Sequence, residues 1–381
     1  MDKRNYTLKE NEIQDIKEKI REIKRKLIKR ISKSKILKRK RKIKKYSILV
    51  EAGILYIVEN LSFQRLADIM AIKHKIVMSD TAWKKQISKL APVFYSVMME
   101  YMKNFKSQIK ANKILGHSNV YALDATDITT EGKKGTLLRA HVSYSITNKI
   151  YMNALIASIK IGESAKLHTI DPNGLYFADR AYGKTPQIEY ICEHGADFIF
   201  RFSPSQVKFF VDAKCKKKID FLALIKERNE KFSFLCFFKH NKMIRTIRVI
   251  ASPLPKEKAD IAVQKVKRAS VKKQRSLQAS TAEFAKWLFL SSSLSPDDFS
   301  DEDIISAYRN RWQIELHFKR SKSLLNFHRL RTSSVDYAFN IVSMWLAVTA
   351  FVYSLFPVLL DRISFDISTF NVFSIFTFLI S

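Results

Sequence analysis

Two aspartates stand directly after apolar runs of strand-like residues. Asp124 follows residues 120–123, and Asp179 follows residues 175–178. A carboxylate at the end of a buried strand costs free energy unless it is paired, hydrogen-bonded or bound to a cation. One such aspartate is ordinary, because aspartate is common in turns. Two of them in a basic chain predict a metal site built from oxygen ligands.

A third acidic candidate lies in a helix predicted over residues 301–325. At about 100° per residue, four of its polar residues fall within a roughly 60° arc of one face; they are Tyr308, Arg311, Glu315 and Lys322. Such a face could be a surface ladder of ion pairs. The same helix also carries apolar side chains on its other sides, at Trp312, Ile314, Leu316 and Phe318. This pattern predicts a helix that is packed on most sides, with its charged face directed at a site.

The spacing Tyr308-x2-Arg311-x3-Glu315-x6-Lys322 resembles the YREK signature of bacterial DDE transposases, the insertion sequence four group, at every position. In the same order, residues 123–126 (Leu-Asp-Ala-Thr) resemble the first-aspartate motif of that family. Residues 179–182 (Asp-Arg-Ala-Tyr) resemble the second, which is usually Asp-Arg-Gly-Tyr. The resemblance extends from about residue 60 to residue 350. It implies that Asp124, Asp179 and Glu315 are the catalytic residues and metal ligands.

The resemblance implies an enzyme that binds the terminal inverted repeats of an insertion sequence, nicks DNA and transfers strands, as a homodimer that holds two ends. Three carboxylates can hold two Mg²⁺ ions about 4 Å apart, and Mn²⁺ is expected to substitute. Double-stranded DNA, as transposon ends and as target, is the expected partner. The residues expected to contact it near the site are Tyr308, Arg311, Lys322, Arg180 and Lys319.

One position departs from the family pattern. Ala181 stands where the second motif usually has glycine. The added Cβ would strain the loop if that position required a positive φ. An alternative therefore stays open, in which the chain is an inactive or domesticated copy that binds DNA without cutting it.

Two other signals compete with this interpretation. Asp127 is a rival to Asp124 as the first ligand, but strand alternation places the two on opposite faces, and the family pattern favours Asp124. Residues 183–185 (Gly-Lys-Thr) resemble the end of a phosphate-binding P-loop, which would require glycine at position 178, where the chain has alanine. We therefore exclude the P-loop.

The implied fold is an α/β, RNase H-like mixed sheet with flanking helices. Strand-like periodicity predicts strands over residues 120–128, 137–146, 150–159, 175–178, 197–202, 231–251 (turning at 240–242) and 286–291. The catalytic core is assigned to residues 116–183 and 286–360. Between Asp179 and Glu315 the chain is longer than one strand and helix require, so residues 184–285 are expected to form a β-rich insertion domain. Residues 361–381 are left as an apolar tail.

The charge balance points to nucleic acid. The 381 residues include 68 Lys and Arg against 36 Asp and Glu, a formal net charge of +32, which attracts polyanions. Residues 1–45 hold 20 Lys and Arg against 6 acids and are expected to form a basic helical arm. Its narrow apolar stripe consists of Ile13, Ile16, Ile20, Ile23, Leu27 and Ile31. The arm either tracks phosphates or docks on the body as a solvated helix. Residues 256–275, with 8 cations against 2 acids, form a second basic segment.

Residues 46–115 are expected to be an all-helical DNA-binding module. Within it, residues 61–70 and 79–90 have the spacing of two short helices around a break, which resembles a helix-turn-helix. The second helix directs Trp83, Ile87 and Leu90 inward and would present Lys84, Lys85 and Lys89 to DNA. Packing of a simple helical scaffold is the alternative.

The cysteines, the first residues and one apolar stretch bear on where the protein is located. Cys192, Cys215 and Cys236 form no CxxC pair, and the first residues are charged, so a reducing bacterial cytoplasm with nucleoid association is expected. Residues 341–360 carry no charge and are long enough to span a bilayer of about 30 Å. Their interruption by Ser343, Thr349, Ser354 and Pro357 favours a core helix, without stable membrane association.

Overall fold

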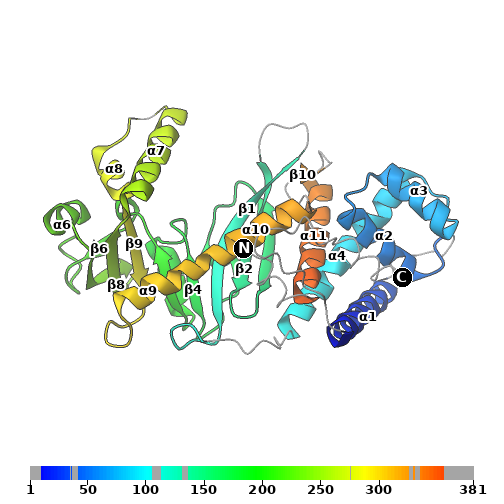
Figure 1. Ribbon diagram of the computed structural model, residues 1–381, viewed down its shortest axis with the longest axis horizontal. Coiled ribbons are helices and arrows are strands. Elements are labelled where there is room, and N and C mark those ends of the chain that lie inside the picture. The colour runs from blue at the N-terminus through cyan, green and yellow to red at the C-terminus, as the bar shows by residue number, and fades with distance from the viewer. Residues whose placement is uncertain are drawn as a thin grey trace.

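Ten strands of the described residues form one mixed sheet, which runs from the left to the centre of Figure 1. The structure, a computed structural model, describes residues 10–34, 36, 42–104, 113–130, 136–274, 276–325, 329–330 and 335–355. The strands are β1 (Val120–Thr130), β2 (Thr136–Ser145), β3 (Ile150–Ser158), β4 (Leu175–Ala178), β5 (Asp197–Arg201), β6 (Phe209–Phe210), β7 (Phe232–His240), β8 (Met243–Pro253), β9 (Trp287–Ser292) and β10 (Arg329–Leu330). Their order is β3-β2-β1-β4-β5-β9-β8-β7-β6, with β10 beside β1.

Helices cover both faces of this sheet. They are α1 (Glu10–Lys33), α2 (Tyr46–Val58), α3 (Phe63–His74), α4 (Asp80–Asn104), α5 (Thr185–Glu193), α6 (Phe221–Arg228), α7 (Lys256–Lys272), α8 (Ala279–Ala285), α9 (Asp301–Tyr308), α10 (Trp312–Leu325) and α11 (Val335–Leu355). The 3₁₀ turns are η1 (Ala165–Leu167), η2 (Pro204–Gln206) and η3 (Arg309–Arg311). Helices α4, α10 and α11 pack on one face of β1 to β3, and α5 contacts β5 and β7 on the other.

The central strands are buried on both faces. Along β1, Ala122 and Ile128 pack into the core that contains α4 and α11, whereas Tyr121 and Leu123 pack into the core that contains α5. Strands β1, β4 and β5 run parallel, and β2 and β3 add an antiparallel meander at one edge. A sheet covered on both faces explains why these segments read as nearly continuous apolar runs. The predicted mixed α/β architecture, of the kind expected for an RNase H-like catalytic domain, is confirmed.

Residues 184–285 do not stand apart from this sheet. They supply β5, which pairs in parallel with β4, and the hairpin of β7 and β8, which joins through β9. They also contain helices, and the basic segment predicted after residue 255 forms α7, which projects with α8 beyond the sheet (Figure 1). These strands continue the main sheet, so the structure does not separate residues 184–285 from it. The β-rich insertion domain over 184–285 stays a prediction.

The N-terminal region is helical, and its first helix is docked. In α1, Ile20, Ile23, Leu27 and Ile31 are each at most 3% exposed and belong to the same core as α2 and α4. The described part of the predicted apolar stripe thus packs against the body and leaves the basic side outward. Residues 1–9, 35 and 37–41 of the predicted arm lie outside the described residues, as do the side chains of Ile13 and Ile16.

Helix α4 differs from the short second helix expected of a helix-turn-helix. It begins at Asp80 as predicted but continues for 25 residues. Its apolar spacing does not stop at Leu90 but runs on through Phe94, Val97 and Met98, all at most 2% exposed. Because this face continues, the helix extends from the N-terminal region to the sheet, where it packs against α11.

The apolar stretch predicted as a core helix forms most of α11. Its described side chains between Ile341 and Ala350 are buried, and the helix contacts α2, α4, β2 and β3. Within the part of the chain that the structure describes, no helix is long and apolar enough to cross a membrane. Residues 356–360 of that stretch and the tail 361–381 lie outside the described residues.

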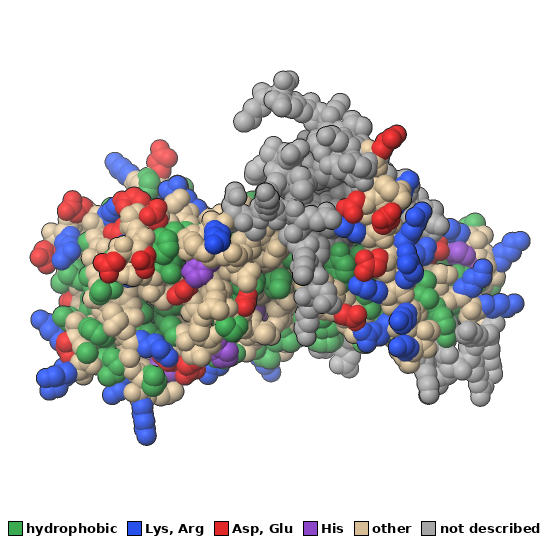
Figure 2. All heavy atoms as spheres, turned by 90° about the horizontal axis from the view of Figure 1, so that it is seen from below, with side chains coloured by type: hydrophobic (Ala, Val, Ile, Leu, Met, Phe, Trp, Pro, Cys, Tyr) green, Lys and Arg blue, Asp and Glu red, His purple; other side chains and the backbone are tan. Residues whose placement is uncertain are grey.

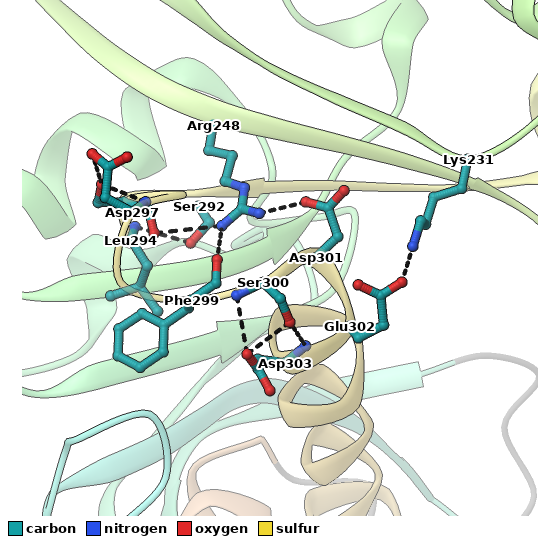
Figure 3. Close-up of polar contacts among 11 residues, drawn as sticks. Lys231, Arg248, Ser292, Leu294, Asp297, Phe299, Ser300, Asp301, Glu302 and Asp303 are labelled. Atoms are coloured by element: carbon teal, nitrogen blue, oxygen red, sulfur yellow. Dashed lines mark hydrogen bonds and ion pairs between the residues drawn. The ribbon is translucent and has the colours of Figure 1, made fainter.

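A buried arginine anchors the start of α9 to the sheet (Figure 3). Arg248 of β8 is 4% exposed and donates to the carbonyl of Phe299 (2.6 Å) and to the carboxylate of Asp301. Ser300 caps the helix by accepting from the Asp303 backbone N–H at 3.2 Å, and the Asp303 carboxylate accepts in return from the Ser300 N–H. This capping box and the ion pair fix the direction in which α9 leaves the sheet.

Candidate active site

Three parallel strands end side by side. The register pairs Leu123 of β1 with Ala178 of β4, and Ala178 with Phe200 of β5. The next residue along each chain completes a row across this edge of the sheet: Asp124, Asp179 and Arg201. The carboxyl ends of parallel strands are where open α/β sheets bind ligands. The sheet therefore brings together the two predicted aspartates and adds an arginine that the sequence patterns did not single out.

Asp124 is held in an environment that disfavours its charge. Burial raises the pKa of this carboxyl to about 7, and the negative charge of Asp179 contributes in the same direction. The backbone N–H of Ala125, 2.8 Å from Oδ1, and the charge of Arg311 act the opposite way. The two aspartates thus lie close enough for the charge of Asp179 to oppose ionisation of Asp124.

Asp179 begins a turn that is tied to helix α9. The backbone N–H of Ala181 donates to Oδ1 of Asp179 at 2.8 Å, and the hydroxyl of Tyr308 donates to the carbonyl of Ala178 at 3.2 Å. Tyr308 is 9% exposed and lies in the core. Its place differs from the DNA contact predicted for it, because the hydroxyl is already used to hold the end of β4 against α9.

The predicted helix over residues 301–325 is divided. Helix α9 ends at Tyr308, the turn η3 covers Arg309–Arg311, and α10 begins at Trp312. A 3₁₀ turn has three residues per turn, so the arc calculated with 100° per residue does not hold across it. The charged side chains nevertheless face the site: Arg311 forms an ion pair with Glu315, and its charge acts on Asp124. Arg311 thus lies within reach of the first and third predicted acids.

Lys322 of α10 lies within electrostatic reach of Asp127 and Asp124. It is half-buried; burial lowers the pKa of its ammonium group, and the charges of Asp127 and Asp124 partly offset this. Lys319, one turn earlier, is exposed. Both Arg311 and Lys322 act on Asp124, which fits the positioning of phosphate, by Arg311 through its planar fork and by Lys322 as a point charge.

The donor types in this site suit a divalent cation, but its ligands are not assembled. Carboxylates are the ligands that Mg²⁺ takes. Among the described residues, no group of three or more His, Cys, Asp or Glu side chains lies close enough together to hold a metal ion. In this structure Glu315 is paired with Arg311 instead. Convergence of all three acids on metal therefore remains a proposal.

Comparison with known proteins identifies the chain. The profile of the family described as "Transposase DDE domain" matches residues 116–352, more than half of the sequence. The chain belongs to the DDE transposase family. It is 24% identical over 310 residues to an Escherichia coli K12 protein named as transposase InsL for insertion sequence element IS186A, and 25% identical over 311 residues to the Escherichia coli transposase for insertion sequence element IS421. Each alignment covers 79% of this chain and 82% of the relative.

The DDE transposase turn after β4 accepts alanine at position 181 without strain. The described non-glycine residues with positive φ do not include Ala181, so the strain considered for the glycine-to-alanine change does not arise. The glycine that this turn requires is Gly183, where a Cβ would lie 2.1 Å from the carbonyl oxygen of Arg201 and 2.8 Å from the Cα of Phe202. The turn packs directly on the backbone at the end of β5, which keeps Asp179 beside Arg201.

Gly183→Ala is therefore expected to destabilise the fold. The close atoms belong to the backbone, so either β5 or the Asp179 turn must shift, and overpacking of this kind costs about 1–3 kcal/mol. Chemical denaturation of the purified variant measures the free energy of unfolding. Gly162→Ala is the matched control, because a Cβ there meets nothing within 4 Å and the φ is not positive. Equal stability of the two variants would show that the contact between the turn and β5 is loose.

Asp127, the rival ligand, has a different partner. Its carboxylate accepts from Nε of Arg139 at 2.7 Å, and its side chain is 46% exposed. Its cross-strand neighbour is Arg139, whereas that of Asp124 is Val142 in the core beneath α11. The two aspartates thus lie on opposite faces, as alternation predicts, and Asp124 lies on the face that carries α10.

Glu163 is an acid that the motifs did not indicate. Burial and the charge of Asp179 raise the pKa of its carboxyl, and its own charge raises that of Asp124. Gln187 of α5 holds the adjoining loop by accepting from Ser164 Oγ (3.0 Å) and the Ala165 N–H (2.7 Å). Because this loop and the Asp179 turn are brought together only by folding, no local pattern could have revealed Glu163.

Proposed function

We propose that the chain is a transposase that binds the terminal inverted repeats of an insertion sequence and performs metal-dependent DNA nicking and strand transfer, as a homodimer that holds two ends. The row of Asp124 and Asp179 at adjacent strand ends carries this proposal, because both carboxylates are only partly exposed and Asp124 lies within reach of Arg311, the partner of Glu315. The spacing of Tyr308, Arg311, Glu315 and Lys322 supports placement in the group with the YREK signature.

The three acids would hold two Mg²⁺ ions, with Mn²⁺ as a substitute. The ions would supply activation of a water or a 3′-hydroxyl and stabilisation of the leaving oxygen. The chain's own groups do the rest. Release of Glu315 from Arg311 would free the carboxylate as a ligand and the guanidinium for a phosphate, which Arg binds bidentately. Tyr308 would keep the Asp179 turn in place through Ala178.

Two rows of cations on the N-terminal helices are suited to the DNA backbone. In α1, exposed cations recur every fourth residue at Arg21, Arg25, Lys29 and Lys33. At the start of α4, Lys84, Lys85 and Lys89 are exposed, while Trp83, Ile87 and Leu90 are fully buried, the orientation that a DNA-reading helix needs. Figure 2 shows Lys and Arg side chains gathered over the N-terminal helices at the right of the view. The bases of the end sequence would be read from α4.

The row on α1 gives a quantitative prediction. Replacing its four cations by glutamine should weaken binding of DNA of any sequence and lower the slope of log K against log salt by up to about 0.9 for each lost phosphate contact. Gel shifts over a salt series measure the slope. Substitution is preferable to deleting the arm, because Ile20, Ile23, Leu27 and Ile31 are part of the core. An unchanged slope would mean that α1 only packs on the body.

The proposed activity is tested with the purified full chain and a linear DNA that carries the inverted repeats flanking its own gene. Mg²⁺ should produce nicks at the repeat ends and, with target DNA, strand-transfer products, and chelation should abolish both. Binding without cleavage in either Mg²⁺ or Mn²⁺ would instead establish the alternative, a copy that retains only DNA binding. The ordinary φ of Ala181 removes the observation that favoured this alternative.

A further inference from the structure

Two guanidinium groups beside Asp179 lack a partner within the part of the chain that the structure describes. Among the described residues, neither Arg180 nor Arg201 forms an ion pair or a hydrogen bond, and the Nε atom of each is buried without an acceptor. Both side chains are only partly exposed. A buried donor without an acceptor costs about 1–3 kcal/mol, more for a charged group. Charged groups are rarely buried without a partner, so these two arginines are available to an anionic ligand.

The positive charges are concentrated at this point. The charges of Arg180 and Arg201 repel one another. The charge of Arg311 acts likewise on Arg201, while Asp179 attracts both arginines. Arg311 is paired with Glu315, so Asp179 is the carboxylate whose charge acts on both Arg180 and Arg201.

The backbone holds these arginines in place. Arg201 is the last residue of β5 and continues the row of Asp124 and Asp179. Arg180 is part of the turn whose Gly183 packs against the Arg201 carbonyl. The relative position of the backbone at Arg180 and Arg201 is therefore set by the sheet and by a turn packed against it, and a fixed backbone is the kind of preorganisation that an anion site requires.

We propose that Arg201, together with Arg180, forms a binding site for a phosphate of the DNA backbone immediately beside Asp179. The ligand class is a phosphodiester, whose two unesterified oxygens match the forked donors of arginine. The site would hold the strand undergoing reaction against the row of strand ends. Arg201 is then a positioning residue for DNA, distinct from the cations on α1 and α4, which lie on other elements. This inference rests on the proposed function for the identity of its ligand.

The experiment compares Arg201→Met, Arg201→Lys and Arg180→Met with the exposed Arg309→Met as a matched control. Thermal unfolding of the full chain is followed in sodium chloride and in inorganic phosphate at equal ionic strength. In chloride, Arg201→Met should unfold at the wild-type temperature or higher, because it removes repulsion and a buried unpaired charge. In phosphate, the wild type should gain a few degrees, Arg201→Met and Arg180→Met should gain little, and Arg201→Lys should fall between them. Arg309→Met should behave like the wild type.

Cleavage of DNA that carries the inverted repeats then links the site to function. Arg201→Met should reduce nicking about 10- to 100-fold, because one misplaced phosphate disturbs the reacting geometry. The proposal is overturned if Arg201→Met unfolds at a lower temperature in chloride and keeps the full phosphate gain, the signature of a structural arginine. It is also overturned if the variant nicks at the wild-type rate. If the wild type never nicks but loses its phosphate gain on substitution, the anion site stands and the proposed activity fails.

Discussion

Single replacement of Asp124, Asp179 or Glu315 by the corresponding amide is expected to abolish nicking and strand transfer, with rates lower by orders of magnitude. The amide keeps the shape of the side chain but removes the charge that would hold Mg²⁺. For Asp124 the substitution also removes a buried charge that is already costly to ionise, so Asp124→Asn should not destabilise the fold. Nicking is measured with labelled inverted-repeat DNA in Mg²⁺.

DNA binding should survive these substitutions. Affinity in a gel shift without metal is expected to stay within a few fold of the wild type, or to rise slightly, because the lost carboxylate no longer repels phosphate. The cations on α1 and at the start of α4 are untouched. Loss of binding together with activity would point to misfolding, which circular dichroism of the same samples detects.

Asp127→Asn is the internal control. Asp127 lies on the opposite face of β1 and is paired with Arg139 at 2.7 Å. This exposed ion pair is worth little, about 0–1 kcal/mol, so the variant should fold and cleave. Normal cleavage by Asp124→Asn with loss of cleavage by Asp127→Asn would mean that the first ligand is misassigned. If all three amide variants cleave like the wild type, the metal mechanism itself is wrong.

The strands and the two aspartates could be predicted because their signals are local. An apolar run that ends in Asp124 or Asp179 specifies both a buried strand and the position of the charge at its end. Parallel pairing of β1 with β4 then brings the two acids to one edge of the sheet. The start of α4 at Asp80 and the inward direction of Trp83, Ile87 and Leu90 follow from the same kind of periodicity.

The other features of the site could not be predicted, because they depend on contacts between segments that are distant in the sequence. Only the register of β4 with β5 places Arg201 beside Asp179. Only the loop that Gln187 holds places Glu163 near the site. Helical periodicity treated residues 301–325 as continuous, yet η3 divides them, and the hydroxyl of Tyr308 contacts a carbonyl 130 positions earlier in the chain. Spacing within one element could not foresee any of these contacts.

Breaking the buried ion pair between Arg248 and Asp301 is expected to have the largest effect on stability. Arg248 is 4% exposed, so Asp301→Asn leaves its charge buried with only carbonyl partners, a loss of about 3–5 kcal/mol in the free energy of unfolding. Arg248→Met should cost less, because the remaining Asp301 lies in the first turn of α9, where the helix dipole favours a carboxylate. Urea denaturation measures both.

A double variant and a neighbouring exposed ion pair test whether burial of the Arg248–Asp301 pair is the cause of the loss of stability. Arg248→Met combined with Asp301→Asn should lower the free energy of unfolding by less than the sum of the single changes, because the double variant leaves no unpaired charge at this position. Lys231 and Glu302 form an ion pair one residue further along α9, but their side chains are 37% and 68% exposed (Figure 3). Lys231→Met should therefore cost about 0–1 kcal/mol. If Asp301→Asn costs no more than Lys231→Met, the buried pair does not anchor α9, and the placement of Tyr308 against Ala178 must come from core packing alone.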